Sequence, residues 1–307
     1  MITNDALSHV LYALPPKIKG ALFNLSPTVQ QNVAEIRLRK NLPLTLTVQG
    51  ETVFLKKDGQ TRFTLCDGLV YVTENDISEC FRLLCNDSVF AHENELRDGF
   101  VIMRNGCRAG VCGKLTEGGF MQDISSINLR ISREIKGCAN ELIKRYNGGG
   151  LLIAGPPGSG KTTILRDFIR QLSNGISGRI NRMAVIDSRG EISGGGTLDL
   201  GAATDILMSD QKARGVEIAL RTMFPDYIAF DEIGNLDELS AVSQCFLSGV
   251  KIITTAHSQT LFDLKNRTVT EQLLKSGVIE QIVILPRLIG DEITFLTPKE
   301  LYCENLA

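Results

Sequence analysis

Residues 151–163 read LLIAGPPGSGKTT, an apolar run that leads into a glycine-rich loop and a lysine–threonine pair. The spacing G-x-x-x-x-G-K-T is that of the phosphate-binding P-loop (Walker A), which connects a buried strand to a helix. We therefore expect a strand over 151–154, then the loop, then a helix opened by Lys161 and Thr162. Glycine lets the backbone approach a phosphate closely, and a helix N-terminus attracts anions.

The same loop predicts a site for ATP and Mg²⁺. Lys161 would place a positive charge on the β- and γ-phosphates, and the Thr162 hydroxyl would be a ligand of Mg²⁺. A glycine-rich turn that binds nothing is the alternative, and the lysine–threonine pair in a strand–loop–helix context argues against it. The expected nucleotide-binding residues are Gly155, Pro156, Pro157, Gly158, Ser159, Gly160, Lys161, Thr162 and Thr163.

The second half of the chain predicts an α/β fold with a parallel sheet. Short apolar segments alternate with helical ones, a pattern typical of a parallel sheet with helices on both faces. The expected strands are 151–154, 183–187, 227–231, 251–255 and 281–285. The expected helices lie near 162–172, 212–223, 236–246 and 269–276.

Before the glycine run at 148–150 the pattern is mixed, which favours a separate α+β domain. Gln49-Gly50 and Asn105-Gly106 are turn signals between apolar segments, and each predicts a hairpin. We place the smaller N-terminal domain with its linker at residues 1–137 and the P-loop core at residues 138–307. The expected N-terminal elements are short helices at 5–14 and 27–35, strands at 35–39 and within 45–55, a helix at 75–84 and a hairpin at 99–115.

Residues 227–230, YIAF, form an apolar run that ends in Asp231 and Glu232. The last residues of a buried parallel strand lie at the carboxyl edge of the sheet, where the P-loop also lies. Asp231 therefore suits a ligand of Mg²⁺, as in a Walker B strand, and Glu232 suits a catalytic role in which it polarises the attacking water. The alternative for both residues is a solvated strand end.

Other polar residues follow apolar runs and are expected at the same edge. Residues 183–186 lead into Asp187 and Glu191, and residues 251–253 lead toward His257. Because strand ends converge in a doubly wound sheet, we expect these catalytic candidates to face the γ-phosphate. For His257 the alternative is an ordinary core or surface histidine.

Composition excludes several classes of protein. Of the 307 residues, 43% are hydrophobic and 22% are charged, which is typical of a folded chain. A net charge of −2 gives no overall positive field for nucleic acid or anionic lipid. The eight cysteines lack zinc-ligand spacing, so we expect reduced thiols. No signal peptide or apolar run of membrane-spanning length is evident, so we expect a cytoplasmic protein without direct membrane insertion.

The order of these motifs resembles that of the secretion (traffic) ATPases of type II and type IV systems. Those proteins carry Walker A, an acidic box, Walker B and a histidine box on a RecA-like core behind a smaller N-terminal domain. The similarity is closer still to the stage III sporulation protein AA family of endospore-forming bacteria. The segments that carry it are EIRLRKNLP at 35–43, AHENELRDGFVIMRNGCRAGVCGK at 91–114, ISSINLRISREIKGCA at 124–139, GPPGSGKTTILRD at 155–167, TLDLGAATDIL at 197–207 and ALRTMFPDYIAFDEIG at 219–234.

This resemblance implies an Mg²⁺-dependent motor ATPase that energises assembly of, or transport through, a membrane channel complex during sporulation. It implies a homo-oligomer, a hexameric ring when active, with the membrane channel proteins of the stage III complex as partners. It also implies a place on the mother-cell side of the forespore membrane, peripheral through those partners. One position departs from the family: Ser188 stands where the acidic box carries a further acidic residue, which bears on Asp187 and Glu191.

Arginines that reach the equatorial oxygens accelerate phosphoryl transfer by about 10³–10⁵-fold in other NTPases. The resemblance makes Arg221, which precedes the Walker B strand, a candidate site arginine. It also implies that Arg130 and Arg133, in the segment between the domains, close over the nucleotide and tie the domains together while ATP is bound. A surface ion pair or a solvated charge is the alternative for each.

Other functions remain open on the sequence. A nucleotide-gated binding module would bind ATP with little or no hydrolysis, and the Ser188 departure keeps this alternative open. A nucleic-acid-linked ATPase is disfavoured because no basic module is appended and the charge is balanced. A small-molecule kinase fits poorly, because no lid segment is evident and the N-terminal domain would be unexplained.

Overall fold

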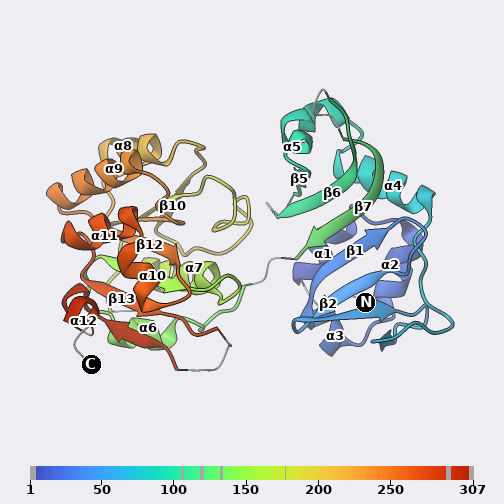
Figure 1. The fold of residues 1–307 in the computed structure, drawn as a ribbon, viewed down its shortest axis with the longest axis horizontal. Helices are drawn as coiled ribbons and strands as arrows, with labels where there is room; N and C mark the ends of the chain where they lie inside the picture. Colours follow the sequence, from blue (N-terminus) through green and yellow to red (C-terminus); the bar gives the residue numbers. More distant parts are fainter. Residues whose placement is uncertain are drawn as a thin grey trace. The chain divides into compact units, whose positions relative to one another are not determined.

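The computed structural model describes residues 5–104, 107–117, 121–131, 134–176, 178–287 and 292–303. The chain divides into two units, Met1–Arg133 and Glu134–Ala307 (Figure 1). The sequence placed this boundary between residues 137 and 138. The division into two units falls four residues earlier, within the segment that the sequence assigns to the linker. The predicted turn Asn105-Gly106 and the candidate arginine Arg133 lie outside the described residues.

The first unit is built on a sheet whose described pairings are all antiparallel, in the order β4-β3-β2-β1-β7-β6-β5. Gln49 and Gly50 have φ values of 52° and 86°, as a two-residue hairpin turn requires, so this predicted hairpin is confirmed. β7 was not predicted, because polar residues fill much of it and its first half is largely exposed. The strands are β1 Val33–Arg39, β2 Thr45–Val48, β3 Glu51–Leu55, β4 Thr61–Arg62, β5 Phe100–Ile102, β6 Arg108–Leu115 and β7 Met121–Arg130.

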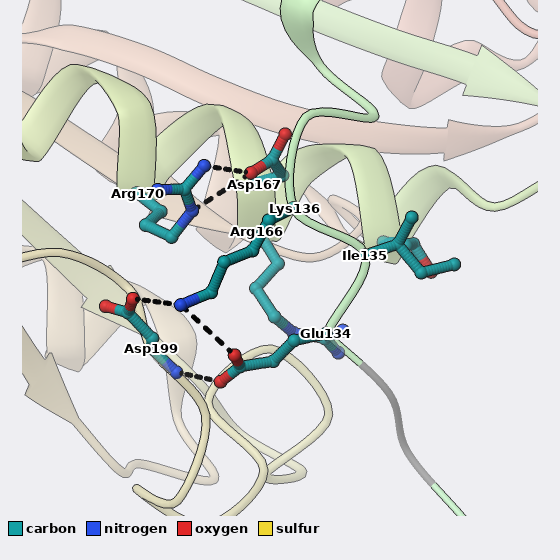
Figure 2. Close-up of a pocket in the computed structure, with 8 residues that line it drawn as sticks. Glu134, Ile135, Lys136, Arg166, Asp167, Arg170 and Asp199 are labelled. Atoms are coloured by element: carbon teal, nitrogen blue, oxygen red, sulfur yellow. Dashed lines mark hydrogen bonds and ion pairs between the residues drawn. The ribbon is translucent and has the colours of Figure 1, made fainter. Parts of the chain in front are cut away.

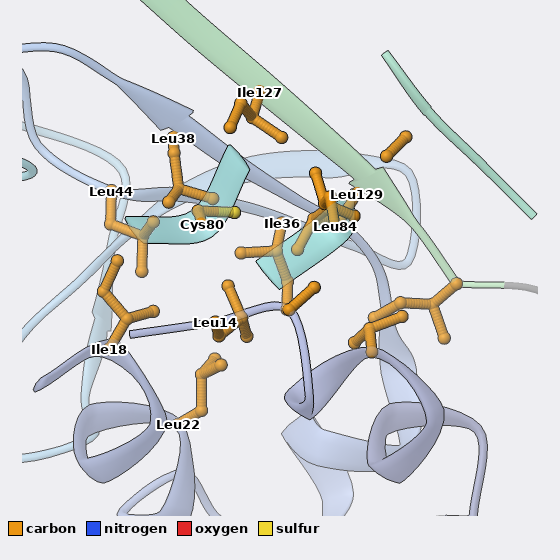
Figure 3. Close-up of a cluster of buried hydrophobic side chains, with 14 of the residues drawn as sticks. Leu14, Ile18, Leu22, Ile36, Leu38, Leu44, Cys80, Leu84, Ile127 and Leu129 are labelled. Atoms are coloured by element: carbon orange, nitrogen blue, oxygen red, sulfur yellow. The ribbon is translucent and has the colours of Figure 1, made fainter. Parts of the chain in front are cut away.

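Helices of the first unit cover the sheet with an apolar core (Figure 3). Leu14, Ile18 and Leu22 belong to one buried cluster with Ile36 of β1 and Leu129 of β7. The helix expected at 27–35 ends earlier, because the chain is already extended at residue 33, where β1 begins. The helical elements are α1 Asp5–Leu11, α2 Pro16–Phe23, α3 Pro27–Asn32, α4 Glu74–Leu84, the 3₁₀ turn η1 Val89–His92 and α5 Glu93–Arg97.

The second unit contains the parallel sheet that the sequence predicts, in the order β10-β9-β11-β12-β8-β13-β14. Only its β13–β14 pairing is antiparallel among the described pairings. The edge strands β10 and β14 were not predicted, because each is short and at most half-buried. The strands are β8 Leu151–Gly155, β9 Met183–Ile186, β10 Thr204–Leu207, β11 Tyr227–Phe230, β12 Lys251–His257, β13 Gln281–Ile284 and β14 Thr294–Leu296.

Helices pack on both faces of this sheet, as the near-continuous apolar strands require. Leu152 of β8 joins a core with residues of α8 and α9, whereas Leu151 and Ile153 join a core with residues of α6 and α7. The predicted helices of this unit are confirmed to within one residue at each end. The helices are α6 Asn140–Arg145, α7 Lys161–Ser173, α8 Lys212–Thr222, α9 Leu236–Leu247, α10 Leu261–Asn266, α11 Thr268–Lys275 and α12 Pro298–Cys303.

Two expectations concern the whole chain. Within the described part, no helix has both the length and the apolar composition needed to cross a bilayer. All eight cysteines are free thiols, and burial raises the pKa of Cys85 to about 11. Four of the eight, Cys80, Cys85, Cys107 and Cys245, are buried.

Candidate functional site

The register of the parallel strands places the carboxyl ends of β8, β9, β11 and β12 at the same edge of the sheet. His257, the last residue of β12, pairs with Gly155, the last residue of β8. Phe230 at the end of β11 pairs with Thr254 of β12 and with Ile186 at the end of β9. The residues that follow β11 and β9 therefore emerge at the same sheet edge as the glycine-rich loop.

The loop between β8 and α7 leaves open space on its outer side. Gly158 and Gly160 have φ values of 79° and 85°, which L side chains rarely adopt, and a Cβ at either would meet no atom within 4 Å. Gly155 is constrained from within, because a Cβ there would lie 2.7 Å from the Ser159 hydroxyl oxygen. The loop is therefore packed against the core at Gly155 and open at Gly158 and Gly160, which leaves room for an anion beside the backbone of these two glycines.

Lys161, the first residue of α7, extends back toward the loop. It is 6% exposed, and its ammonium donates hydrogen bonds of 2.9 Å to the carbonyl oxygens of Gly155 and Pro156. Burial lowers the pKa of Lys161, and the carboxylates of Asp231 and Glu232 act on it in the opposite direction. The ammonium therefore lies within electrostatic reach of both carboxylates.

Asp231 follows β11 and is fixed by two neighbours. Its Oδ1 accepts a hydrogen bond from the Thr255 hydroxyl of β12, at 2.5 Å. The Lys212 ammonium, at the start of α8, donates to the main-chain carbonyl of Asp231 at 3.3 Å and to that of Glu232. The acidic pair is therefore held from both sides by neighbouring elements of the core.

The protein oxygens at this sheet edge suit Mg²⁺, which also binds waters and phosphates, better than they suit a metal ion whose ligands all come from the protein. Mg²⁺ in phosphate sites takes one or two protein oxygens and completes its shell with waters and phosphates. Thr162, on the first turn of α7, and Asp231 supply oxygens of this kind. In the part of the chain that the structure describes, no three His, Cys, Asp or Glu side chains gather into a ready-made metal site.

The carboxylate of Glu232 lies between two side chains. Its Oε1 is 3.1 Å from Nη1 of Arg267, and its Oε2 is 3.8 Å from Nε2 of His257. Arg267 and Lys212 were missed by the sequence reasoning. No motif marks them, because their contacts depend on how 258–267 turns back to the sheet edge and on where α8 begins.

Asp187 lies at the predicted sheet edge, directly after β9, but its carboxylate is engaged by its own loop. It is buried, and its carboxylate accepts hydrogen bonds from the backbone N–H of Glu191 at 3.1 Å and of Ser193 at 2.8 Å. The Ser193 hydroxyl donates to it as well, at 2.7 Å. Arg166 of α7 holds the same loop by donating to the carbonyls of Glu191 and Ile192. Asp187 therefore shapes the loop rather than offering a free carboxylate to a phosphate.

The exposed side chain of Glu191 borders the same hollow as the acidic pair. Ser188 lies in the same lining, so the position that departs from the family belongs to this hollow. The hollow is bordered by Asp187, Ser188, Arg189, Glu191, Lys212, Asp231, Glu232, Gly234 and His257.

Of the arginines predicted for the site, Arg221 belongs to the same unit as the acidic pair and lies away from it. Arg221 is exposed on the last turn of α8, nine positions and about 13 Å along the helix from Lys212, which contacts the acidic pair. α8 runs from the carboxyl edge of the sheet toward the edge where β11 begins, so Arg221 lies at the opposite end. Arg130 ends β7 of the first unit, where its Nε lies 3.7 Å from Oε1 of Glu35. Arg133 lies outside the described residues.

A second charged cluster anchors the beginning of the core on the side of α7 (Figure 2). The Lys136 ammonium lies 3.2 Å from the Asp199 carboxylate and 3.7 Å from that of Glu134. The backbone N–H of Asp199 donates to Glu134 at 2.6 Å, and that of Ala139 donates to Asp167 at 2.9 Å. The segment 134–139 is therefore bonded to the helix that carries Lys161 and Thr162.

Asp167 is the buried centre of this cluster. Burial acts to raise its pKa, but hydrogen bonds from Ala139, Arg170 and Gln171 outweigh burial and leave the pKa lowered. Arg170 approaches it to 2.6 Å. Thr163, which was predicted to bind nucleotide, borders this cluster, and its carbonyl accepts a hydrogen bond from the Cys138 thiol.

Solved structures and curated sequences define the class to which this fold belongs. The chain is similar to the pilus retraction motor PilT, solved with bound ADP, with a TM-score of 0.58 and 17% identity over 94% of this chain and 85% of that one. It is 31% identical over 150 residues to the type II secretion system ATPase E of Vibrio cholerae serotype O1, a match that covers 48% of this chain and 27% of that protein. The fold is that of the secretion ATPases.

The particular family follows from the whole length of the chain. The family described as Sporulation stage III, protein AA matches residues 7–291. The chain is 31% identical over 296 residues to the stage III sporulation protein AA of Bacillus subtilis (strain 168), covering 92% of each protein. This protein therefore belongs to the stage III sporulation protein AA family, as the resemblance of its motifs predicts.

Proposed function

We propose that this protein hydrolyses ATP with Mg²⁺ and drives the assembly of, or transport through, a membrane channel complex during sporulation. The observation that carries the proposal is the position of Lys161. Its buried ammonium is hydrogen-bonded to two neutral carbonyl oxygens at the mouth of an open glycine loop. A buried cation held by neutral groups favours an anionic ligand. Membership of the sporulation family supports the biological setting.

In this proposal the core divides the chemistry among its own residues. Lys161 and the loop N–H groups hold the phosphates, aided by the N-terminus of α7. Glu232 orients and polarises the attacking water, and His257 lies beside it at the end of β12. Glu191 approaches the same hollow from the loop that Asp187 and Arg166 hold.

Thr162 and Asp231 are the residues that would hold Mg²⁺. When bound, the ion neutralises charge on the phosphate oxygens. The Thr255 hydroxyl of β12 donates a hydrogen bond to Oδ1 of Asp231. Because this bond fixes the orientation of the carboxylate, it also fixes where Oδ2 points. ATP is the expected nucleotide, since relatives of this fold include a motor solved with ADP.

We further propose that residues 138–307 form a RecA-like core behind an N-terminal domain with its linker at residues 1–137. The parallel sheet with the loop after β8 supports this assignment. The active form would be a hexameric ring that works with the channel proteins of the stage III complex from the mother-cell side. Arg221 would then act on nucleotide held by a neighbouring subunit, and Arg130 and Arg133 would close over the nucleotide and tie the two domains together.

A nucleotide-gated binding module is the second candidate function. It is favoured by the acidic loop, where Ser188 replaces an acidic residue and Asp187 is consumed by hydrogen bonds to the loop itself. In that case ATP would bind tightly and switch the shape of the chain, with little phosphate release. Adding partner proteins would not raise the rate.

The test is phosphate release by the purified chain with Mg²⁺–ATP, measured over a range of protein concentrations. We expect turnover that EDTA abolishes and that Lys161→Ala lowers by more than about a hundredfold. Lys275→Ala is the matched control, because Lys275 sits in an exposed i,i+4 pair with Glu271 on α11. A rate per subunit that climbs with concentration would support a ring.

Tight ATP binding with no release at any concentration would favour the gated module. The absence of both binding and release by a folded wild-type chain would contradict both functions. A rate that is equal in Lys161→Ala and wild type would show that the phosphate loop is not the site.

A further inference from the structure

One carboxylate oxygen of Glu232 is hydrogen-bonded to a cation, and the other faces a histidine ring that lies beyond hydrogen-bond distance. Arg267 lies 3.1 Å from one oxygen, and the ring of His257 lies 3.8 Å from the other. A general base must present a carboxylate oxygen to water within hydrogen-bond distance. In this arrangement the oxygen that faces Arg267 is already engaged.

Arg267 also faces the phosphate loop. It borders a hollow together with Pro157 of the loop and His257, and its side chain is 51% exposed. It is the residue between α10 and α11, so its backbone is fixed by two helices while its guanidinium extends to the sheet edge. Arg267 therefore borders a hollow that also reaches Pro157 of the loop, while its guanidinium is hydrogen-bonded to Glu232.

We propose that Arg267 restrains Glu232 until the terminal phosphate of a nucleoside triphosphate draws the guanidinium away. This proposal rests on the proposed function of the site. A terminal phosphate carries more negative charge than one carboxylate and offers three oxygens to the planar fork of an arginine. A diphosphate has no group at that position, so Glu232 stays paired after phosphate loss.

With this switch, hydrolysis would depend on the presence of the terminal phosphate and would need no contact from a second domain. Glu232 becomes able to polarise water when the substrate itself has released it. Because the partners of Arg267 compete for one guanidinium, the affinity for triphosphate must depend on the charge of Glu232. This dependence separates the proposal from a purely structural ion pair, in which Arg267 never leaves Glu232.

The experiment measures the affinity of the full chain for ADP and for β,γ-imido-ATP, each with Mg²⁺, by calorimetric titration. We expect Arg267→Gln to weaken β,γ-imido-ATP binding by about tenfold, the scale of one charge-assisted hydrogen bond, and to leave ADP binding unchanged. Arg182→Gln is the matched control, since Arg182 forms an exposed pair with Asp226, 3.2 Å apart, beside the starts of β9 and β11. It should change neither affinity.

A double-mutant cycle tests the competition. Glu232→Gln should tighten β,γ-imido-ATP binding in the wild-type background, because the guanidinium is then released. In the Arg267→Gln background the same change should have no such effect beyond the general loss of one negative charge. Equal tightening in both backgrounds would show that Glu232 acts by charge alone and would overturn the proposal.

The remaining outcomes separate this proposal from the proposed function. If wild type binds both nucleotides and Arg267→Gln keeps the same ratio of affinities, only the switch is overturned. If a folded wild-type chain binds neither nucleotide, the proposed function falls and the switch with it. Should Arg267→Gln not fold, Arg267→Lys decides: it keeps the charge without the fork, so we expect about a threefold loss for the triphosphate alone, and an unchanged ratio overturns the proposal.

Discussion

Two buried charges of α7, Asp167 in the cluster beside residues 134–139 and Lys161 at the phosphate loop, differ in the groups to which they are hydrogen-bonded. Beside the segment 134–139, Asp167 is buried and receives hydrogen bonds from Ala139, Arg170 and Gln171, which leave its pKa lowered. At the start of α7, Lys161 is equally buried but donates to neutral carbonyl oxygens, and burial lowers its pKa.

This difference indicates that the charge of Asp167 stabilises the fold, whereas the charge of Lys161 is suited to bind an anionic ligand. A buried carboxylate that gains bonds on folding stabilises the native state. A buried ammonium whose pKa is lowered by desolvation costs stability, and a bound anion would repay that cost. Substitutions in the first cluster should therefore change unfolding, and substitutions around the second should change phosphate chemistry.

The largest effect is expected at the metal ligand. Asp231→Asn keeps an oxygen that can accept the Thr255 hydrogen bond but removes the charge that Mg²⁺ needs. We expect phosphate release with Mg²⁺–ATP to fall by about a hundredfold or more, with the urea midpoint nearly unchanged. A comparable loss of stability, or an unaffected rate, would show that Asp231 belongs with the structural cluster instead.

A loss of stability is expected from Asp167→Asn. The change weakens the bonds to Arg170 and leaves buried groups poorly paired, so the free energy of unfolding should fall by about 2–3 kcal/mol. Nucleotide affinity of the folded variant should stay within about threefold of wild type. Urea unfolding and calorimetric titration measure the two quantities. Retained stability with lost binding would reverse the roles assigned to the two clusters.

The pH dependence sharpens this assignment. The pKa of Asp167 is lowered in the folded chain, so its stabilisation is fully present above the unfolded value of about 3.9 and is lost as pH falls through the folded pKa. The stability difference between wild type and Asp167→Asn should be constant from pH 7 to pH 5 and should shrink near pH 3. A difference that grows on acidification would contradict the lowered pKa.

The smallest effect is expected at the exposed part of the anchor. The side chains of Lys136 and Asp199 are 58% and 43% exposed, so their ion pair is screened by water. Lys136→Ala should lower the free energy of unfolding by no more than about 0.5 kcal/mol. Thermal unfolding in low and high salt measures it. A loss of several kcal/mol would mean that this pair, rather than Asp167, fixes the segment to α7.

The fold of the second unit is readable from sequence where burial is complete. Strands β8, β9 and β11 are apolar and buried throughout, and β12 and β13 contain the short apolar runs 252–253 and 282–284, so each predicts a buried strand. The edge strands β10 and β14 carry polar or exposed residues, so their sequences do not differ from loops. β7 of the first unit escapes detection for the same reason.

The site follows the same division. Lys161, Asp231, Glu232 and His257 are readable because each is tied to the end of an apolar strand. Arg267 and Lys212 are not, because a long side chain reaches the site from a position with no motif. Sequence alone also cannot show that the Asp187 carboxylate is occupied by its own loop, since this depends on the turn at 188–193.

One measurement tests the central claim most directly: the single-turnover rate of phosphate release from Mg²⁺–ATP by wild type and by Glu232→Gln, with nucleotide binding measured on the same samples. Glu271→Gln is the control, because Glu271 is paired with Lys275 on the surface of α11. We predict that Glu232→Gln binds Mg²⁺–ATP at least as tightly as wild type and releases phosphate about a hundredfold or more slowly, while the control matches wild type. Equal release rates in Glu232→Gln and wild type would contradict the claim that this sheet edge hydrolyses ATP.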